Sequence, residues 1–148
     1  MDSKPNPRTD QSEPSTPLSR CSILIAEDEA NIRFLMVETL KKHGYDVLEA
    51  ANGRDAVAMA CDPLQPIRLL ITDLGLPGMN GREVMAQVAS SRPDLKVLCL
   101  SAAVPDGTLG VSPQQFLAKP FTLKGLVKKV KQILGEPSDT DLRNRKVG

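Results

Sequence analysis

Residues 69–81, Leu-Leu-Ile-Thr-Asp-Leu-Gly-Leu-Pro-Gly-Met-Asn-Gly, join an apolar run to a turn-forming segment, and Asp73 stands at the junction. A carboxylate at the C-terminal tip of a buried strand lies where ligands bind in an open parallel α/β sheet. Two more apolar runs end in charged residues, at Glu27-Asp28-Glu29 and at Lys119-Pro120. We therefore expect two acidic strand ends and one basic strand end to meet at one edge of a sheet.

Short apolar runs alternate with helical patterns along the chain. The predicted strands are 22–26, 46–50, 68–73, 96–101 and 115–118, and the predicted helices are 30–43, 53–61, 81–91 and 122–134. Strict alternation predicts a parallel sheet covered by helices on both faces, with right-handed connections. The expected fold class is α/β: a flavodoxin-like, doubly wound sheet of five parallel strands in the order 2-1-3-4-5. Its ligand site would lie between strands one and three, which carry Asp28 and Asp73.

The apolar spacing also predicts which side of each helix faces the core. In the first helix the predicted inward residues are Ile32, Leu35, Met36 and Leu40. Thr122 is the predicted N-cap of the last helix. Residues 102–114 contain two prolines and two glycines, so we expect helix four to be short or degraded, with one or two turns at most.

Length and composition bound the remaining possibilities. The 148 residues suit one domain, and a net charge of +1 gives no electrostatic case for nucleic acid or a membrane surface. Residues 1–20 form a polar, proline-rich stretch, so we expect a disordered tail, a domain over 21–135 and a flexible tail over 136–148. No signal peptide is evident, and no apolar stretch approaches the roughly 18 residues of a membrane span.

The cysteine pattern indicates the cellular compartment. The three cysteines are widely spaced and form no CxxC motif, which argues against a disulfide framework or a zinc site. We read this as a reducing compartment and expect a cytoplasmic protein. Cys99 lies in an apolar run and is expected to be a core residue.

The residues at the strand ends define a chemistry. Glu27, Asp28 and Asp73 would gather three carboxylates, which repel one another unless a cation or a proton intervenes. Mg²⁺ fits, because it prefers oxygen ligands and is commonly bound by one or two carboxylates together with phosphate. Lys119 and the Ser101 hydroxyl could then stabilise an incoming phosphoryl group. Asp73 would be the nucleophile and would form an aspartyl phosphate.

These residues also carry a resemblance to a known family. Glu27-Asp28, Asp73, Ser101 and Lys119-Pro120, each following its own strand, resemble the receiver domain of two-component response regulators, and the resemblance covers 21–135. It implies that Asp73 is the phosphoacceptor. It also implies that Glu27 and Asp28 are the acidic pair, with Asp28 the more direct Mg²⁺ ligand, and that the backbone carbonyl of Gly75 ligates the metal.

The resemblance implies further roles and partners. Lys119 matches the active-site lysine of the family, Ser101 its switch hydroxyl and Phe116 its switch aromatic. The implied phosphodonor is a phosphohistidine on a sensor histidine kinase or a histidine phosphotransfer protein. The chain would be a phosphoacceptor that assists its own phosphorylation and dephosphorylation, not a turnover enzyme. It would signal by contact with a downstream protein target.

The chain departs from the family pattern in one segment. Between Ser101 and Lys119 it is several residues shorter, which affects the surface that the family uses for output and dimer formation. We expect a monomer or weak homodimer. The thirteen residues after 135 are too few for a DNA-binding or enzymatic module, so we expect a single-domain response regulator with no direct DNA binding.

Three alternatives remain at this stage. The chain could be a receiver-like binding module that signals without phosphate, or the receiver fragment of a hybrid histidine kinase. A phosphatase of the haloacid dehalogenase type also uses a strand-end Asp with Mg²⁺. Such a phosphatase needs a second Asp two residues after the nucleophile, where this chain has Gly75, and a cap for which there is no sequence.

Overall fold

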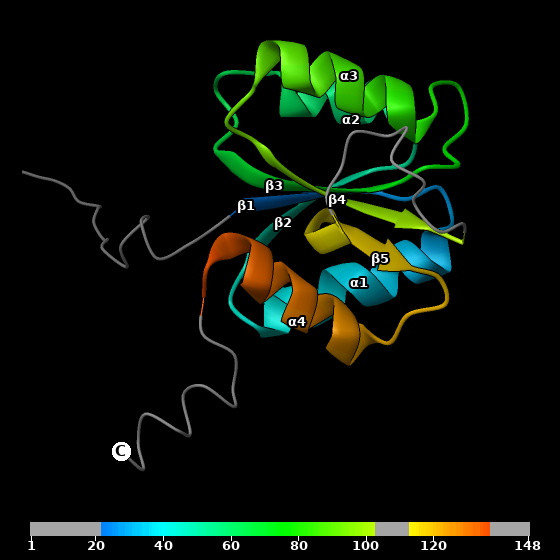
Figure 1. Cartoon of the computed structure of the whole chain (residues 1–148), viewed down its shortest axis with the longest axis vertical. Coiled ribbons are helices and arrows are strands. Elements are labelled where there is room, and N and C mark those ends of the chain that lie inside the picture. Colours follow the sequence, from blue (N-terminus) through cyan, green and yellow to red (C-terminus); the bar gives the residue numbers. More distant parts are fainter. Residues whose placement is uncertain (1–21, 103–112, 137–148) are drawn as a thin grey trace, which may run out of the picture.

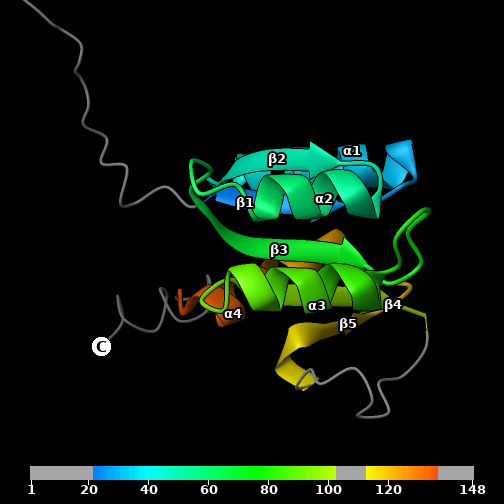
Figure 2. The ribbon, with the colours of Figure 1, turned by 90° about the horizontal axis from the view of Figure 1, so that it is seen from above.

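The computed structural model describes residues 22–102 and 113–136, which form one five-stranded sheet with helices on both faces (Figures 1 and 2). The predictions for tails at 1–20 and 136–148 therefore fall outside the described residues, apart from Glu136. Most of the predicted short helix-four segment, 103–112, also lies outside them.

The elements follow the expected alternation. The strands are β1 (Ser22–Ala26), β2 (Asp46–Ala50), β3 (Ile67–Asp73), β4 (Lys96–Ser101) and β5 (Phe116–Ala118). The helices are α1 (Ala30–Lys42), α2 (Gly53–Ala60), α3 (Gly81–Ser91) and α4 (Leu123–Leu134), and η3 (Pro113–Gln115) is a 3-10 turn directly before β5. All strand pairs are parallel and the order is β2-β1-β3-β4-β5, which confirms the predicted fold class. The predicted ends lie within one residue of these bounds.

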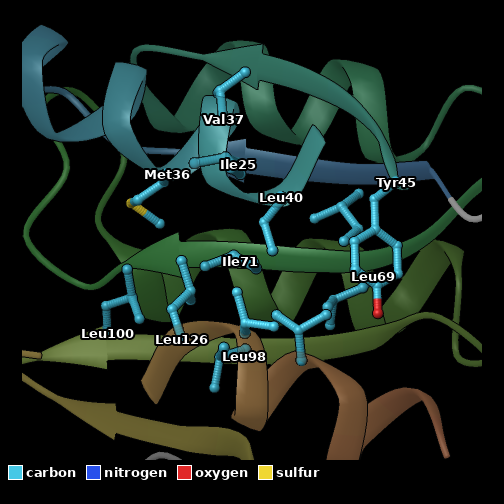
Figure 3. Packing of buried hydrophobic residues seen from close by; sticks show 13 residues of the cluster. Ile25, Met36, Val37, Leu40, Tyr45, Leu69, Ile71, Leu98, Leu100 and Leu126 are labelled. Carbon is cyan, nitrogen blue, oxygen red and sulfur yellow. The ribbon is translucent and has the colours of Figure 1, made fainter. Parts of the chain in front are cut away.

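The helices form two layers around the sheet. Helices α1 and α4 cover one face and α2 and α3 cover the other (Figure 1). The α1/α4 side packs aliphatic residues of β1, β3 and β4 against the helices, with Met36, Leu40 and Leu126 at its centre (Figure 3). Burying such side chains removes roughly 25 cal/mol of unfavourable hydration per Å² of apolar surface. This burial fixes the strands and therefore the edge at which they end.

Two local predictions, the Thr122 cap and the buried Cys99, are confirmed. The hydroxyl oxygen of Thr122 accepts a hydrogen bond from the backbone N–H of Gly125 at 2.9 Å and caps α4. Cys99 is fully buried, and both Cys99 and Cys61 are free thiols. After α1, Gly44 takes a left-handed φ of 92°, a conformation that glycine adopts readily where a helix ends.

The predicted inward face of α1 is wrong at one position. Leu35 is 51% exposed, whereas Met36, Val37 and Leu40 are buried. Ile32 packs against the core as predicted, together with Met36, Val37 and Leu40. The side chain of Arg33, at 19% exposed, is also mostly covered. No helix among the described residues is long and apolar enough to cross a membrane.

Candidate functional site

Asp73 lies at the C-terminal end of β3, the central strand, and is only 9% exposed. Both carboxylate oxygens have partners: Oδ1 accepts a hydrogen bond from the backbone N–H of Gly75 at 2.9 Å, and Oδ2 contacts Nζ of Lys119. The chain turns directly after the strand, where the N–H of Leu74 donates to the carbonyl of Leu100 on β4 at 3.0 Å. The turn thus holds the carboxylate at the sheet edge in one orientation.

The acidic pair follows β1, the neighbour of β3 in the sheet. Glu27 is 2% exposed and Asp28 is exposed. Oxygen atoms of Glu27, Asp28 and Asp73 all lie within 4.8 Å of one another, as the sequence predicted for this edge. Glu27 Oε2 accepts a hydrogen bond from the N–H of Glu29 at 3.0 Å, but buried Oε1 accepts none from the described residues.

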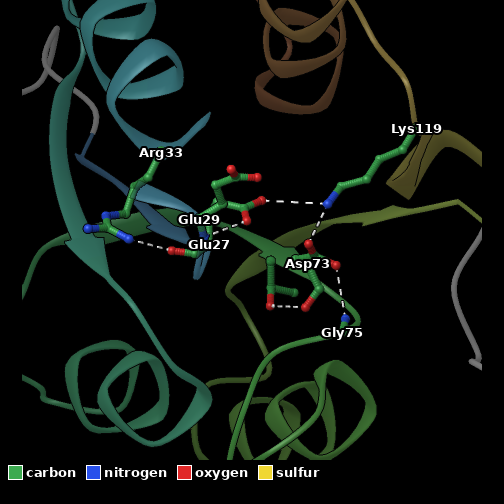
Figure 4. A network of polar contacts seen from close by, with 7 residues as sticks. Glu27, Glu29, Arg33, Asp73, Gly75 and Lys119 are labelled. Carbon is green, nitrogen blue, oxygen red and sulfur yellow. Dashed lines mark hydrogen bonds and ion pairs between the residues drawn. The ribbon is translucent and has the colours of Figure 1, made fainter. Parts of the chain in front are cut away.

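Lys119 reaches the same cluster from the end of β5 (Figure 4). Its backbone N–H donates to the carbonyl of Ser101 at 2.9 Å, which extends the β4–β5 ladder, and its peptide bond with Pro120 is cis. Its Nζ contacts Oδ2 of Asp73 and lies 3.6 Å from Oε1 of Glu27. One ammonium group therefore bridges two of the three carboxylates.

The electrostatics of the cluster follow from this shared charge. Burial raises the pKa of the Glu27 carboxyl, and the negative charge of Asp73 adds to this, while the hydrogen bond from Glu29 and the charge of Lys119 oppose it. Burial lowers the pKa of Lys119, but its hydrogen bond to Asp73 and the charges of both carboxylates outweigh burial, so the net shift is upward. Lys119 therefore stays protonated at neutral pH and shares its positive charge between the carboxyl groups of Asp73 and Glu27.

The remaining predicted site residues lie around this cluster. Ser101 ends β4, one residue beyond the partner of Asp73 in the β3–β4 ladder, and is half-buried. Phe116 begins β5 opposite Cys99 and is also half-buried. Gly75 is exposed, and the hydrogen bond from its N–H to Asp73 places its backbone at the site. The roles predicted for these three residues remain predictions.

Sequence reasoning missed one residue that contacts the acidic pair. The guanidinium Nη1 of Arg33 donates to the backbone carbonyl of Glu27 at 2.7 Å (Figure 4). Its Nε donates to Oε1 of Glu49 at 3.1 Å. The available signal was an arginine in phase with Met36, Val37 and Leu40 on an otherwise apolar stripe.

Comparisons with known proteins agree with this site. A family model for the response regulator receiver domain matches residues 23–131. The chain is 34% identical to the response regulator receiver protein CpdR of Brucella abortus over 116 residues, 76% of this chain and 95% of that protein. It is 32% identical to the sensor kinase CckA of the same species over 127 residues, 82% of this chain but 13% of the kinase.

Solved structures give the same result. The chemotaxis protein CheY4 of Vibrio cholerae superposes with a TM-score of 0.68 at 28% identity, covering 77% of this chain and 98% of CheY4. The fold and the strand-end cluster thus define a receiver module of two-component signalling. The chain belongs to the response regulator receiver domain family. Receiver domains of this family are phosphorylated on aspartate and bind Mg²⁺ at an acidic site, and this chain has such an acidic cluster.

Proposed function

We propose that this chain accepts a phosphoryl group on Asp73 from a phosphohistidine donor, with Mg²⁺ as its cofactor, and signals by protein–protein contact. The observation that carries the proposal is the shared ammonium group. Nζ of Lys119 contacts Asp73 and lies 3.6 Å from Glu27, so a cation already sits between the expected nucleophile and the acidic pair. A phosphoryl group transferred to Asp73 would therefore lie close to the positive charge of Lys119.

The donor set fits Mg²⁺. Three carboxylates supply oxygen atoms within 4.8 Å of one another, and Glu27 presents a buried Oε1 to which no described residue donates a hydrogen bond. A buried carboxylate oxygen without a hydrogen-bond donor is costly unless a cation approaches it. Nζ of Lys119 lies 3.6 Å from this oxygen, beyond hydrogen-bond distance, so Oε1 can still accept a closer cation. Glu27, Asp28, Asp73 and the backbone carbonyl of Gly75 would hold the ion, which would neutralise charge on the phosphoryl oxygens.

The chain's own groups account for the transfer step. A carboxylate oxygen of Asp73 forms a bond to phosphorus while the P–N bond of the donor breaks, and the imidazole leaves with the electron pair. The N–H of Gly75 and Nζ of Lys119 orient the carboxylate before the attack, since each binds a different oxygen. The Ser101 hydroxyl would move to donate a hydrogen bond to a phosphoryl oxygen. The half-buried side chain of Phe116 would then change its rotamer.

The proposed partners follow from this chemistry. The donor is a sensor histidine kinase or a histidine phosphotransfer protein, and the receiver passes the signal to a downstream protein. In this proposal the chain works in the cytoplasm as a monomer or weak homodimer and assists its own phosphorylation and dephosphorylation. It does not bind DNA directly.

The similarity to CckA suggests a second setting for the same chemistry. The matched region is a small part of that kinase, so a receiver of this kind can belong to a longer phosphorelay protein. Phosphotransfer profiling with purified kinases and phosphotransfer proteins distinguishes the settings. A free response regulator takes phosphate from a kinase in trans, whereas a receiver from a hybrid kinase transfers most rapidly to a phosphotransfer protein.

The decisive experiment measures the mass of the intact chain after incubation with acetyl phosphate and MgCl₂. We expect one phosphoryl adduct, lost in Asp73→Asn and absent when EDTA replaces MgCl₂. Asp94→Asn is the matched control, because Asp94 is an exposed carboxylate paired with Arg92 before β4, outside the cluster. No adduct on the wild type would favour a phosphate-independent binding module. Turnover of assorted phosphomonoesters would favour a hydrolase.

A further inference from the structure

Arg33 occupies an unexpected place on α1. Positions 33, 36, 37 and 40 form one stripe at 3–4 spacing, and Met36, Val37 and Leu40 on it are buried. The side chain of Arg33 is only 19% exposed. Arginine is rarely placed on a buried face unless its charge is paired and its N–H groups have acceptors.

The acceptors of Arg33 lie on both sides of it. On one side Nη1 donates to the carbonyl oxygen of Glu27 at 2.7 Å, and on the other Nε donates to Oε1 of Glu49 on β2 at 3.1 Å. The amide N–H of Glu27 in turn donates to the carbonyl of Ala50 at 3.1 Å. The backbone of Glu27 is therefore fixed at its N–H by β2 and at its carbonyl by the guanidinium.

This fixed peptide carries the acidic pair. The carbonyl that Arg33 holds belongs to the peptide bond between Glu27 and Asp28, so its orientation sets the direction in which the Asp28 side chain leaves the turn. Figure 4 shows the guanidinium on one side of Glu27 and Asp73 with Lys119 on the other. Arg33 thus touches the turn from the side opposite the carboxylate cluster.

We infer that Arg33 is a positioning residue that holds the Glu27–Asp28 turn in the arrangement that binds the divalent cation. The inference rests on the proposed function, because it concerns the same site. Arg33 does not touch the nucleophile; it acts through the backbone of Glu27. Groups that orient metal ligands without binding the metal commonly change metal affinity by 10–100-fold when removed.

The sign of the effect separates positioning from simple charge. A guanidinium near a cation site repels the cation, so if charge alone mattered, removing Arg33 would strengthen Mg²⁺ binding. If Arg33 holds the turn, removing it weakens binding. Arg33→Lys sharpens the test, because lysine keeps the charge but lacks the planar fork that reaches Glu27 and Glu49 together.

The test titrates the full chain with MgCl₂ alone and follows amide resonances of the ¹⁵N-labelled protein. We expect Arg33→Ala to raise the Mg²⁺ dissociation constant about tenfold and Arg33→Lys to raise it severalfold. Arg68→Ala is the matched control, since Arg68 is an exposed arginine five residues before Asp73 on β3, roughly 16 Å along the strand. It removes the same charge and should leave the constant within twofold.

Each outcome has one meaning. Unchanged or tighter Mg²⁺ binding in both Arg33 variants, with a wild type that binds the ion, overturns the inference and leaves the proposed function intact. A wild type that binds no Mg²⁺ overturns the proposed function, and the inference with it. If Arg33→Ala fails to fold by circular dichroism, Arg33→Lys decides, because it keeps both the charge and the aliphatic stem.

Discussion

Gly81 shows how tightly the loop after Asp73 is held. It begins α3 and is buried, and a Cβ built on it would lie 2.6 Å from both Cα and Cδ2 of Leu74 and 3.0 Å from the carbonyl oxygen of Asp73. Ordinary carbon contacts are about 3.5–4.0 Å, so Leu74 would have to move by roughly 1 Å. Two of the three crowded atoms belong to the backbone, so a change of side-chain rotamer cannot remove the overlap.

The expected effect of Gly81→Ala follows from two opposing terms. Alanine in place of glycine in a helix gains up to about 1 kcal/mol of intrinsic propensity. Overpacking of this kind costs about 1–3 kcal/mol. We expect the overlap to win and the free energy of unfolding to fall by about 1–2 kcal/mol, or roughly 4–8 °C in Tm for a domain of this size.

The displacement should also reach the site. Leu74 directly follows Asp73 and precedes Gly75, whose N–H holds the carboxylate. A shift of about 1 Å at a reacting group can lower a rate by up to about a hundredfold. We therefore expect Gly81→Ala to slow phosphorylation of Asp73 by acetyl phosphate at least tenfold at a temperature where the variant is folded.

The assay is thermal unfolding by circular dichroism together with the phosphorylation rate from intact mass. Gly75→Ala is the control for stability, because a Cβ there meets only Oδ1 of Asp73, at an ordinary 3.7 Å. Its stability should change by no more than about 0.5 kcal/mol. A Gly81→Ala protein that unfolds at the wild-type temperature and is phosphorylated at the wild-type rate would refute this reasoning.

Three further substitutions test other contacts. Arg92→Ala removes two guanidinium hydrogen bonds of 3.0 Å to backbone carbonyls and should lower stability by about 1–2 kcal/mol in urea unfolding; an unchanged midpoint would contradict this. Tyr45→Phe removes the 2.6 Å bond from the phenol to Glu136 and should cost about 1 kcal/mol, a loss that Glu136→Gln should largely avoid. Gly75→Asn adds a side chain at an exposed position two residues after Asp73, where it would restrict access to the phosphoryl group. The half-life of the aspartyl phosphate should therefore increase; equal half-lives would reject the idea.

The fold could be predicted because its determinants are local. Each strand is a short apolar run bounded by turn residues, and parallel crossovers have one hand. The order 2-1-3-4-5 was expected because it is one of the common orders of doubly wound sheets. The same rule brought Glu27, Asp28, Asp73 and Lys119 together, since the C-terminal ends of parallel strands share one edge. Neither step needed knowledge of a particular side-chain contact.

The face of α1 could not be predicted in the same way. Counting apolar residues favoured Leu35, and Leu35 is 51% exposed. The true stripe includes Arg33, which a hydrophobicity pattern treats as a surface residue although its aliphatic stem can be buried. Its partners are Glu27, which follows β1, and Glu49 on β2, so only the folded chain reveals why an arginine is tolerated there.

The residues with reactive groups and the residues that place them are therefore different sets. Carboxylates and an ammonium at strand ends can be recognised from their chemistry. Gly81 and Arg33 cannot be recognised in this way. Gly81 acts by having no side chain where Leu74 packs against it, and Arg33 acts by binding the backbone carbonyl of Glu27. A relative that keeps all four charged residues but has a larger residue at position 81 would keep the recognisable motif and lose the geometry on which phosphoryl transfer depends.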